Sequence, residues 1–285
     1  MTEPFLKWAG GKRWLSASKQ LPLPASFSRY VEPFLGGGAV FFQLKPARAL
    51  LSDVNPELIE LYVTFRDNYA ALEQAMIAHQ ANHTEENYYK VRSEIPNDPV
   101  ARAARTLYLN RTCWNGLYRV NLKGEFNVPI GTKTKVVDSN EDFAAISKTL
   151  SHAEIRNSDF ENIIDETVEG DFAFIDPPYT VQHNMNGFVK YNEKLFSWND
   201  QVRLRDAVVR AAGRGVAIVL TNADHASVHA LYADEFRYQT LNRASVLAGL
   251  KGRRGPTTEA MFLANMPAIE PSLSGDMYQT SACPR

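Results

Sequence analysis

The chain has 285 residues, more than one typical domain, and 45% of them are hydrophobic and 22% charged. This composition is close to that of an average globular protein and excludes a disordered chain, a collagen and a coiled coil. No apolar run approaches the roughly 20 residues of a membrane helix, and residues 1–12 lack an apolar signal core, so we expect a cytoplasmic protein. The two cysteines, Cys113 and Cys283, form neither a disulfide framework nor a cluster spaced for metal binding, and we expect no metal.

Positive charge is concentrated in one segment, although the formal net charge is only −1. Residues 101–135 contain seven Lys or Arg and a single acid, Glu125, and seven minus one is a local charge of +6. Smaller basic clusters lie at residues 7–19 and 243–254. Such runs are usually solvated surface, but a nucleic acid also requires a cationic surface of this kind. The clustering is compatible with a nucleic-acid partner and does not identify one by itself.

The first predicted elements form a βαβ unit. Residues 29–34 are apolar and β-prone and run into three glycines at 36–38, after which residues 39–44 indicate a helix. Residues 49–53 predict a second strand, and Asn55-Pro56 is typical of a turn and a helix start. We therefore expect a strand, a tight glycine loop, a helix and a further strand.

The middle of the chain is predicted to be mostly helical. Apolar residues at helical spacing predict a helix from residue 57 to about residue 79, and residues 101–110 are helical as well. Residues 111–129 then contain short aromatic and β-branched runs with turn signals at Asn115-Gly116 and Lys123-Gly124. This pattern favours a basic, aromatic hairpin or loop.

Alternation of strands and helices resumes after residue 150. Residues 171–176 predict a buried strand, residues 200–212 a helix and residues 216–221 another strand. Residues 243–247 and 260–263 predict a pair of strands around the loop between them. The α/β pattern is thus divided by the helical middle of the chain.

The glycine motif suits a ligand that carries a nucleoside. Glu-Pro-Phe-Leu-Gly-Gly-Gly at residues 32–38 closes a strand, and glycines allow close approach of backbone to ligand. Asp53 follows Glu32 by 21 positions, at the end of the next strand, where a carboxylate can accept ribose hydroxyls. A dinucleotide fold would have Gly or Ala where this chain has Phe41, which disfavours a dehydrogenase. Gly11-Lys12-Arg13 also lacks the Ser or Thr of a phosphate loop.

A second motif follows the predicted strand 171–176. Asp176-Pro177-Pro178-Tyr179 places two prolines directly after a central strand, where they fix the backbone. The Asp176 carboxylate and the Pro177 carbonyl can accept the two N–H groups of a planar amine, while Tyr179 stacks on its ring. Holding both hydrogens favours a more tetrahedral nitrogen, whose lone pair can attack an aligned electrophile.

Taken together, the motifs resemble a Dam-type, S-adenosylmethionine-dependent DNA adenine N6-methyltransferase (D12 class, alpha group). The resemblance covers residues 5–265, and in this group the cofactor motifs precede the target-recognition region and the catalytic motif follows it. Six motifs carry it in order: Leu6-Lys7-Trp8-Ala9-Gly10-Gly11-Lys12, residues 32–38, Ser52-Asp53-Val54-Asn55, residues 111–121, residues 124–129 and Asp176-Pro177-Pro178-Tyr179. An enzyme that acts on a base amine in a duplex must flip the base, so it needs a cationic surface, a wedge and an aromatic pocket.

The resemblance implies the residues that bind S-adenosylmethionine. Asp159 and Phe160 resemble the contact to the cofactor adenine, and the glycine loop would lie beside the methionine and adenosine parts. The implied set is Trp8, Gly10, Lys12, Glu32, Pro33, Phe34, Gly36, Gly38, Asp53, Asn55, Asp159, Phe160 and Asp176. The implied catalytic residues are Asp176, Pro177, Pro178 and Tyr179.

The resemblance also implies DNA-binding residues. Trp114, where the family commonly has Tyr or Phe, falls at the position of an aromatic that intercalates or fills space near the flipped base. Leu117 and Arg119 fall at positions that read base edges, and Lys7 at one that contacts a flanking base pair, which fits a GATC target. The remaining implied DNA-binding residues are Asn115, Asn121 and the expected phosphate contacts Arg111, Lys251, Arg253 and Arg254.

We therefore expect a Rossmann-like α/β methyltransferase domain, formed by residues 1–55 and 150–266, with an inserted helical target-recognition domain at residues 56–149. That domain would carry the DNA-binding hairpin at residues 111–131, and residues 267–285 would be a flexible tail. The expected partner is double-stranded DNA, with no membrane contact, and a monomer suffices for the reaction. The sequence leaves open whether the enzyme is an orphan, a phage product or the partner of a cognate restriction endonuclease.

Three alternatives stay open at this stage. N4-cytosine methylation uses the same kind of motif, because Asp-Pro-Pro-Tyr suits any planar exocyclic amine. A catalytically silent DNA-binding regulator would show a broken cofactor loop or a lost Asp176, and neither is seen. A nicotinamide oxidoreductase is disfavoured by Phe41 and by the double proline.

Overall fold

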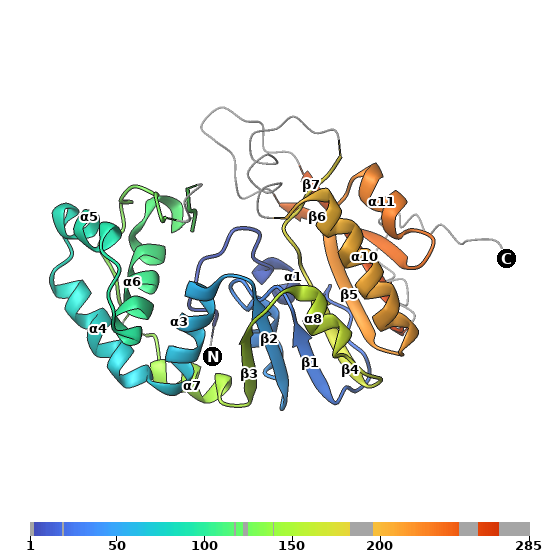
Figure 1. The fold of residues 1–285 in the computed structure, drawn as a ribbon, viewed down its shortest axis with the longest axis horizontal. Coiled ribbons are helices and arrows are strands. Elements are labelled where there is room, and N and C mark those ends of the chain that lie inside the picture. The colour runs from blue at the N-terminus through green and yellow to red at the C-terminus, as the bar shows by residue number, and fades with distance from the viewer. Residues whose placement is uncertain are drawn as a thin grey trace. The chain divides into compact units, whose positions relative to one another are not determined.

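The computed structural model describes residues 3–18, 20–116, 118–121, 125–138, 140–182, 196–244 and 256–267 (Figure 1). The chain divides into two compact units. The first unit consists of residues 1–16 and 35–159, and the second of residues 17–34 and 160–285.

The second unit is built on five strands that follow one another in the order β1-β4-β5-β7-β6. The strands β1 (Arg29–Glu32), β4 (Asp171–Ile175) and β5 (Ala217–Ala223) are parallel. β7 (Pro256–Ala264) runs antiparallel to β5 and to β6 (Arg237–Ala244). Every residue of β4 is buried, as expected for a strand in the middle of a parallel sheet. The helices α8 (Phe160–Asp165), α10 (Trp198–Gly213) and α11 (Ala226–Tyr232) belong to this unit, and α10 packs on α8, α11 and β5.

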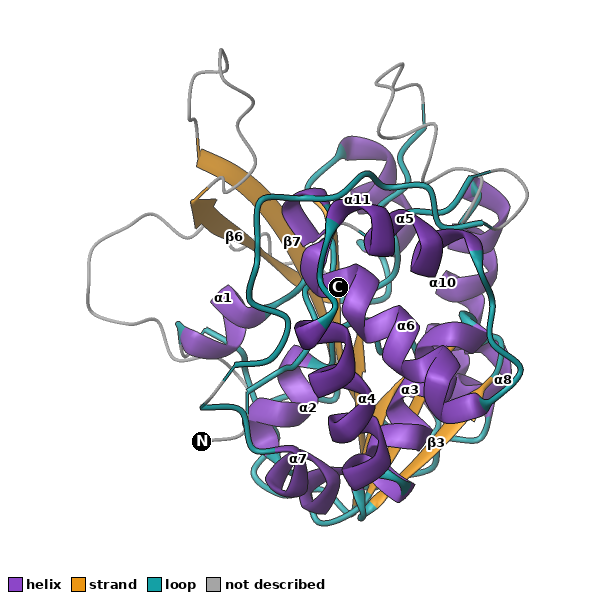
Figure 2. Ribbon diagram, turned by 90° about the vertical axis from the view of Figure 1, so that its left-hand side faces the viewer, coloured by secondary structure: helices purple, strands orange, loops and turns teal. Residues whose placement is uncertain are grey.

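The first unit holds two parallel strands and the helical middle of the chain. The strands β2 (Ala49–Asp53) and β3 (Ala153–Asn157) pair along their whole length, from Ala49 opposite Ala153 to Asp53 opposite Asn157. The helices are α1 (Arg13–Ala17), α2 (Ala39–Leu44), α3 (Pro56–Asp67), α4 (Tyr69–Ala81), α5 (Glu85–Ser93), α6 (Pro99–Thr112) and α7 (Phe143–Leu150), with a short 3-10 turn η1 at Trp114–Gly116. α6 packs against α3 and α4, which lie beside it in Figure 2.

Local chemistry explains where these helices begin. The Asn55 side chain accepts hydrogen bonds from the backbone N–H groups of Glu57 and Leu58, and Pro56 occupies the first turn, so the predicted start of α3 is confirmed. Asp98 and Asp142 cap α6 and α7 in the same way. The single helix expected from residue 57 to 79 is wrong: α3 ends and α4 begins at Asn68, whose backbone is non-helical (φ −137°, ψ 37°).

The predicted strands and helices of the C-terminal half are present with shifted ends. The expected pair at residues 243–247 and 260–263 is the antiparallel pair β6–β7, and its first strand begins earlier, at Arg237. The shift follows from the register, in which Arg237 already pairs with Leu263. Residues 245–255, which include Lys251, Arg253 and Arg254, and the tail from residue 268 lie outside the described residues.

The fold is a mixed α/β fold with a mostly parallel sheet arrangement, so the expected Rossmann-like class is confirmed. The boundaries of the two units do not coincide with the expected domain boundaries at 55/56 and 149/150. A separate helical domain therefore stays a prediction. No helix in the described ranges is long and apolar enough to cross a membrane.

Candidate functional site

The Asp-Pro-Pro-Tyr motif begins directly after the last residue of β4, at the carboxyl end of the parallel strands of the second unit. The Asp176 carboxylate is half-buried, and its Oδ1 accepts a hydrogen bond of 2.7 Å from the hydroxyl of Thr221. Thr221 lies on the neighbouring strand β5 and is fully buried. The direction of the Asp176 carboxylate is therefore set by a rigid strand.

The ring of Tyr179 is held by a second contact from the same sheet. Its hydroxyl donates a hydrogen bond of 2.9 Å to Oε2 of Glu259 on β7, a residue with only 4% of its surface exposed. Burial raises the pKa of Tyr179 well above its usual value, and the negative charges of Asp176 and Glu259 raise it further. The Tyr179 side chain is therefore a neutral phenol, and its O–H group donates a hydrogen bond to the Glu259 carboxylate.

A further carboxylate lies at the end of β1. Glu32 is buried, and its Oε2 accepts a hydrogen bond of 2.8 Å from the hydroxyl of Tyr30. Burial raises the pKa of Tyr30, followed by the charge of Glu32 and, more weakly, that of Asp176. Since β1 and β4 are parallel neighbours, Glu32 and Asp176 follow the same edge of this part of the sheet. That edge is electronegative and suits a positively charged ligand.

Aromatic rings gather beside the expected cofactor residues of the second unit. The Phe34 ring stacks on Phe160 with 5.2 Å between centroids, and both rings contact Phe196 at 5.6 Å. The Arg203 guanidinium lies over the Phe160 ring, 4.9 Å from its centroid. Phe34 and Phe160, both implied by the resemblance, are thus brought together. Pro33, which precedes Phe34 in the chain, is buried.

In the first unit, Asp53 holds the glycine loop in place. Its Oδ2 accepts a hydrogen bond of 3.0 Å from the Gly36 N–H, and its Oδ1 accepts one of 3.0 Å from the Asn55 N–H. Burial raises the pKa of Asp53, and the N–H groups of Gly36, Asn55 and Val54 oppose this shift. The spacing noted in the sequence thus corresponds to a contact between the end of β2 and the loop.

Trp8 closes over the glycine loop. A Cβ atom on Gly36, which has a φ of +47°, would lie 2.7 Å from Cδ1 of Trp8, so only glycine fits here. The indole of Trp8 also stacks on the Tyr118 ring, with 5.2 Å between centroids and 21° between planes. The Tyr118 hydroxyl donates to the Glu57 carboxylate, and burial followed by this charge raises the pKa of Tyr118. Sequence reasoning missed Tyr118, which links the loop to the hairpin.

Other expected cofactor residues have clear structural roles. Lys12 is buried, and its ammonium group donates a hydrogen bond of 2.9 Å to the Gly10 carbonyl. The Asn55 side chain caps α3, so its local role is structural. Gly38 has a φ of +62° at the start of α2, and Asp159 follows β3.

The expected DNA-binding residues Lys7, Trp114 and Asn115 lie around the end of α6. The Lys7 backbone exchanges two hydrogen bonds with the Asn110 side chain, and its aliphatic stem covers Gly116. Trp114 leaves 53% of its surface exposed, and Asn115 is exposed with a left-handed backbone (φ 57°). An exposed Trp on a basic segment is unusual for core packing and is typical of a ligand surface.

Positive charge is concentrated beside Lys7. Partial desolvation of its ammonium group lowers the pKa of Lys133, and the neighbouring positive charges of Lys7 and Arg111 lower it further. Lys7 and Lys133 are both exposed. Part of the positive charge counted in the sequence is therefore on the surface of the first unit, whereas Arg105 is buried and Arg102 forms an ion pair with Glu60.

The hairpin expected after α6 is present in its described part. Antiparallel bridges join Cys113 to Ile130 and Val120 to Phe126. Exposed Arg119 donates from Nε to Oδ1 of Asn127 at 3.2 Å. Asn121 exchanges backbone and side-chain hydrogen bonds with Glu125. Leu117 and residues 122–124 lie outside the described residues.

The expected phosphate contact of Arg111 finds a different use in the structure. Its guanidinium donates to the Val136 carbonyl at 2.9 Å and forms an ion pair with Glu141, and its side chain is only 13% exposed. A guanidinium occupied in this way joins α6 to the segment before α7. The geometry therefore favours a structural role for Arg111, in place of the predicted one.

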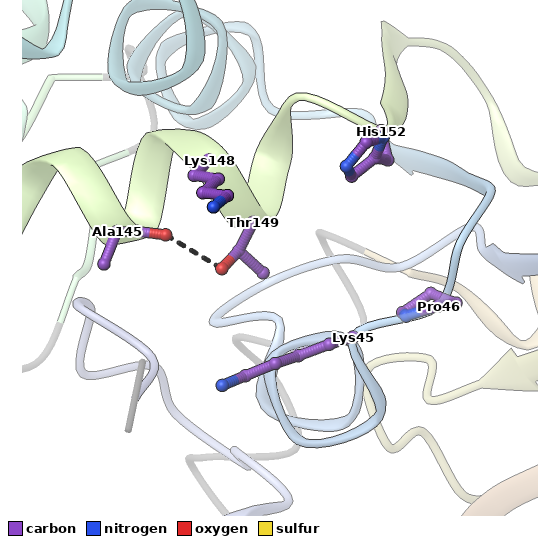
Figure 3. A pocket seen from close by; sticks show the side chains of 6 residues that line it. All are labelled: Lys45, Pro46, Ala145, Lys148, Thr149 and His152. Carbon is purple, nitrogen blue, oxygen red and sulfur yellow. Dashed lines mark hydrogen bonds between the residues drawn. The ribbon is translucent and has the colours of Figure 1, made fainter.

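One cavity of about 300 Å³ lies elsewhere in the first unit (Figure 3). It lies at the ends of α2 and α7, where β2 and β3 begin, whereas Asp53 and Asp159 follow the opposite ends of these strands. None of the residues singled out in the sequence lines it. Its lining residues are Lys45, Pro46, Ala145, Lys148, Thr149 and His152.

Comparison with known proteins gives a consistent result. The model of the family described as D12 class N6 adenine-specific DNA methyltransferase matches residues 8–246. The type II methyltransferase M1.LlaDCHI of Lactococcus lactis subsp. cremoris is 38% identical over 266 residues, which are 90% of this chain and 93% of the relative. The type II methyltransferase M.MjaIII of Methanocaldococcus jannaschii is 35% identical and covers 78% of this chain and 84% of its own. The DNA adenine methylase of Serratia marcescens is 31% identical, with 87% and 94% covered.

Proposed function

Because the chain belongs to the D12 class of N6 adenine-specific DNA methyltransferases and so methylates adenine in DNA, we propose that S-adenosylmethionine is its methyl donor and a flipped-out adenine its acceptor. The observation that carries this proposal is the Asp176 to Tyr179 motif at the end of a fully buried strand, with its carboxylate oriented by Thr221. An exposed Trp114, a basic segment and the aromatic ring of Tyr179 support the proposal, because base flipping requires a wedge, a cationic surface and an aromatic pocket.

The residues of the first unit fit the proposed donor. When bound, S-adenosylmethionine supplies a methyl group on a positively charged sulfonium. At Gly36 the Trp8 indole lies so close to the backbone that a Cβ would clash with it, and we propose that the loop and Trp8 together contact the donor. The Asp53 carboxylate accepts backbone hydrogen bonds from Gly36, Asn55 and Val54, and because a carboxylate has about four acceptor sites it retains capacity for one from a ribose hydroxyl. Lys12 and Asp159 complete the set that we propose on this unit.

The residues of the second unit would act on the adenine amine. The Asp176 carboxylate and the Pro177 carbonyl would accept one N–H each, and the Tyr179 ring would stack on the base. Accepting both hydrogens would favour a tetrahedral nitrogen, whose freed lone pair would form the new N–C bond as the bond from the methyl group to the donor sulfur breaks; the donor would leave as a neutral thioether, and one amine proton would pass from the nitrogen to solvent. Since Thr221 already orients Asp176, little reorganisation is needed when the amine arrives.

Residues 56–149 would recognise the target. Trp114 would fill the gap left by the flipped base, and Arg119, Leu117 and Lys7 would read base edges in GATC. The exposure of Trp114 and of the basic residues around it supports this placement. A restriction endonuclease with the same target would be the partner of such an enzyme, as in the type II class to which the names of two relatives refer.

The test is to incubate the protein with S-adenosylmethionine and unmethylated plasmid DNA, and to analyse the nucleosides by mass spectrometry. We expect N6-methyladenine with the wild type and with the surface control Asp206→Ala, and none with Asp176→Ala. Formation of N4-methylcytosine would instead identify the exocyclic amine of cytosine as the methyl acceptor. Full activity of Asp176→Ala would refute the role of the Asp176 to Tyr179 motif. Modification-sensitive sequencing of the same DNA identifies the target site.

A further inference from the structure

Glu259 is a buried carboxylate on β7 that no motif in the sequence singled out. In the β5–β7 register it lies opposite Ala223, two positions after Thr221 on β5. Side chains two positions apart on a strand share a face, and so do directly opposed residues. Thr221 and Glu259 therefore project from the same face of the sheet, near the carboxyl end of β5.

The contacts of these two residues hold both functional groups of the motif, and the Thr221 hydroxyl also interacts with Tyr179. Thr221 donates to the Asp176 carboxylate at 2.7 Å, and Glu259 accepts from the Tyr179 hydroxyl at 2.9 Å. Each contact fixes one functional group of the motif from a neighbouring strand. An O–H···O⁻ hydrogen bond is about twice as strong as a neutral one, so Glu259 restrains the tilt of the tyrosine ring effectively.

We propose that Glu259 is a positioning residue that holds the Tyr179 ring at the angle required for stacking on the flipped base. The inference rests on the proposed function, since it assumes that Tyr179 stacks on a planar base that carries an exocyclic amine. A buried carboxylate is costly unless it is hydrogen-bonded, and an apolar side chain would fill the same place in a sheet at lower cost. The hydrogen bond from Tyr179 gives a carboxylate at this position a function that an apolar side chain would lack.

The residue that Glu259 acts through is Tyr179, and this makes the proposal testable by a double-mutant cycle. We expect Glu259→Leu to lower kcat by about tenfold or more, the factor expected for a lost hydrogen bond to a charged group, with cofactor affinity unchanged. Glu259→Gln keeps an oxygen that accepts from the Tyr179 hydroxyl and should restore most of the activity. In a Tyr179→Phe background, which lacks that hydroxyl, Glu259→Leu should have no further effect.

A fluorescence measurement tests the same contact without turnover. With 2-aminopurine at the target position, stacking on Tyr179 quenches the emission of the flipped base. We expect brighter emission from the complex of Glu259→Leu than from those of the wild type and Glu259→Gln. Thermal unfolding and calorimetric cofactor binding report whether each variant is folded. If Glu259→Leu does not fold, the cycle is run with Glu259→Gln and Tyr179→Phe, with a small and non-additive effect expected.

The outcomes separate this inference from the proposed function. A wild type that forms no N6-methyladenine contradicts the proposed function. An active wild type with unchanged kcat and emission in folded Glu259→Leu overturns the role of Glu259 alone. An equal loss of activity from Glu259→Leu in the wild-type and Tyr179→Phe backgrounds also overturns it, because Glu259 would then act through another group.

Discussion

Replacing Thr221 by valine tests whether the orientation of the Asp176 carboxylate matters for catalysis. Valine has nearly the shape of threonine but lacks the hydroxyl that donates to Asp176 Oδ1 at 2.7 Å. Thr221 is fully buried and its hydroxyl interacts with both the Asp176 carboxylate and the Tyr179 hydroxyl, so the substitution removes these contacts and leaves no cavity. The variant therefore tests what the Thr221 hydroxyl contributes to the motif as a whole.

The magnitude follows from the kind of hydrogen bond that is lost. A hydrogen bond to a charged group contributes about 1.5–3 kcal/mol. If this contribution is fully present in the transition state, the methyl-transfer rate falls by roughly 10- to 150-fold. The free energy of unfolding should fall by only about 1 kcal/mol, because water can reach the exposed part of Asp176, and the Tm should drop by about 2–4 °C.

The assay is single-turnover transfer of a labelled methyl group to duplex DNA, alongside thermal unfolding. Thr167→Val is the control: the buried Thr167 hydroxyl lies before the amino end of β4, donates to the Ile164 carbonyl at 2.6 Å and accepts from the Arg214 guanidinium at 3.2 Å, so it too is a buried hydroxyl that interacts with a charged group. The control should lose a similar amount of stability and keep its transfer rate. A Thr221→Val rate within twofold of the wild type, with the fold intact, would refute the reasoning.

Two further predictions concern the cofactor loop and the hairpin. Gly36→Ala should reduce cofactor affinity in calorimetry by at least about tenfold, because its Cβ would clash with Trp8 and its positive φ costs about 1–2 kcal/mol. The control Gly213→Ala, where the added Cβ meets open space, should bind the cofactor normally. Normal affinity of Gly36→Ala would disprove a role of the glycine loop in cofactor binding. Arg119→Ala should relax site preference by about 1–3 kcal/mol in sequencing of methylated DNA if it reads a base edge. Lys135→Ala, which removes an exposed cation from the same basic segment, should weaken binding uniformly and in a salt-dependent way, and the same behaviour of Arg119→Ala would make it a phosphate contact.

Much of the fold could be predicted because its signals are local. The run of apolar residues at 171–175 indicates a buried strand wherever the sheet places it, and Asn55-Pro56 caps and starts α3 through bonds within one turn. The hairpin after α6 was readable from its turn residues in the same way. The break at Asn68 was not, since an uninterrupted helical spacing of apolar residues continues across it.

The contacts within the site depend on residues that are distant in sequence. Arg111 could be predicted only as a free cation, because its partner Glu141 is 30 positions away. The motif partners of Asp176 and Tyr179 lie 45 and 80 positions further along the chain. In the sequence, Thr221 cannot be distinguished from any other strand residue, and Glu259 is a single acidic residue directly before the predicted apolar strand 260–263.

The sequence by itself therefore determined the class of the fold, the family and the chemical groups of the motif, because each of these is encoded in neighbouring residues. Only the tertiary structure decided which side chains orient those groups, which cations are occupied internally and which stay exposed. The physical reason is that strand order and register, which no local pattern encodes, place β5 beside β4 and β7 beside β5, so that residues of both strands contact the motif after β4.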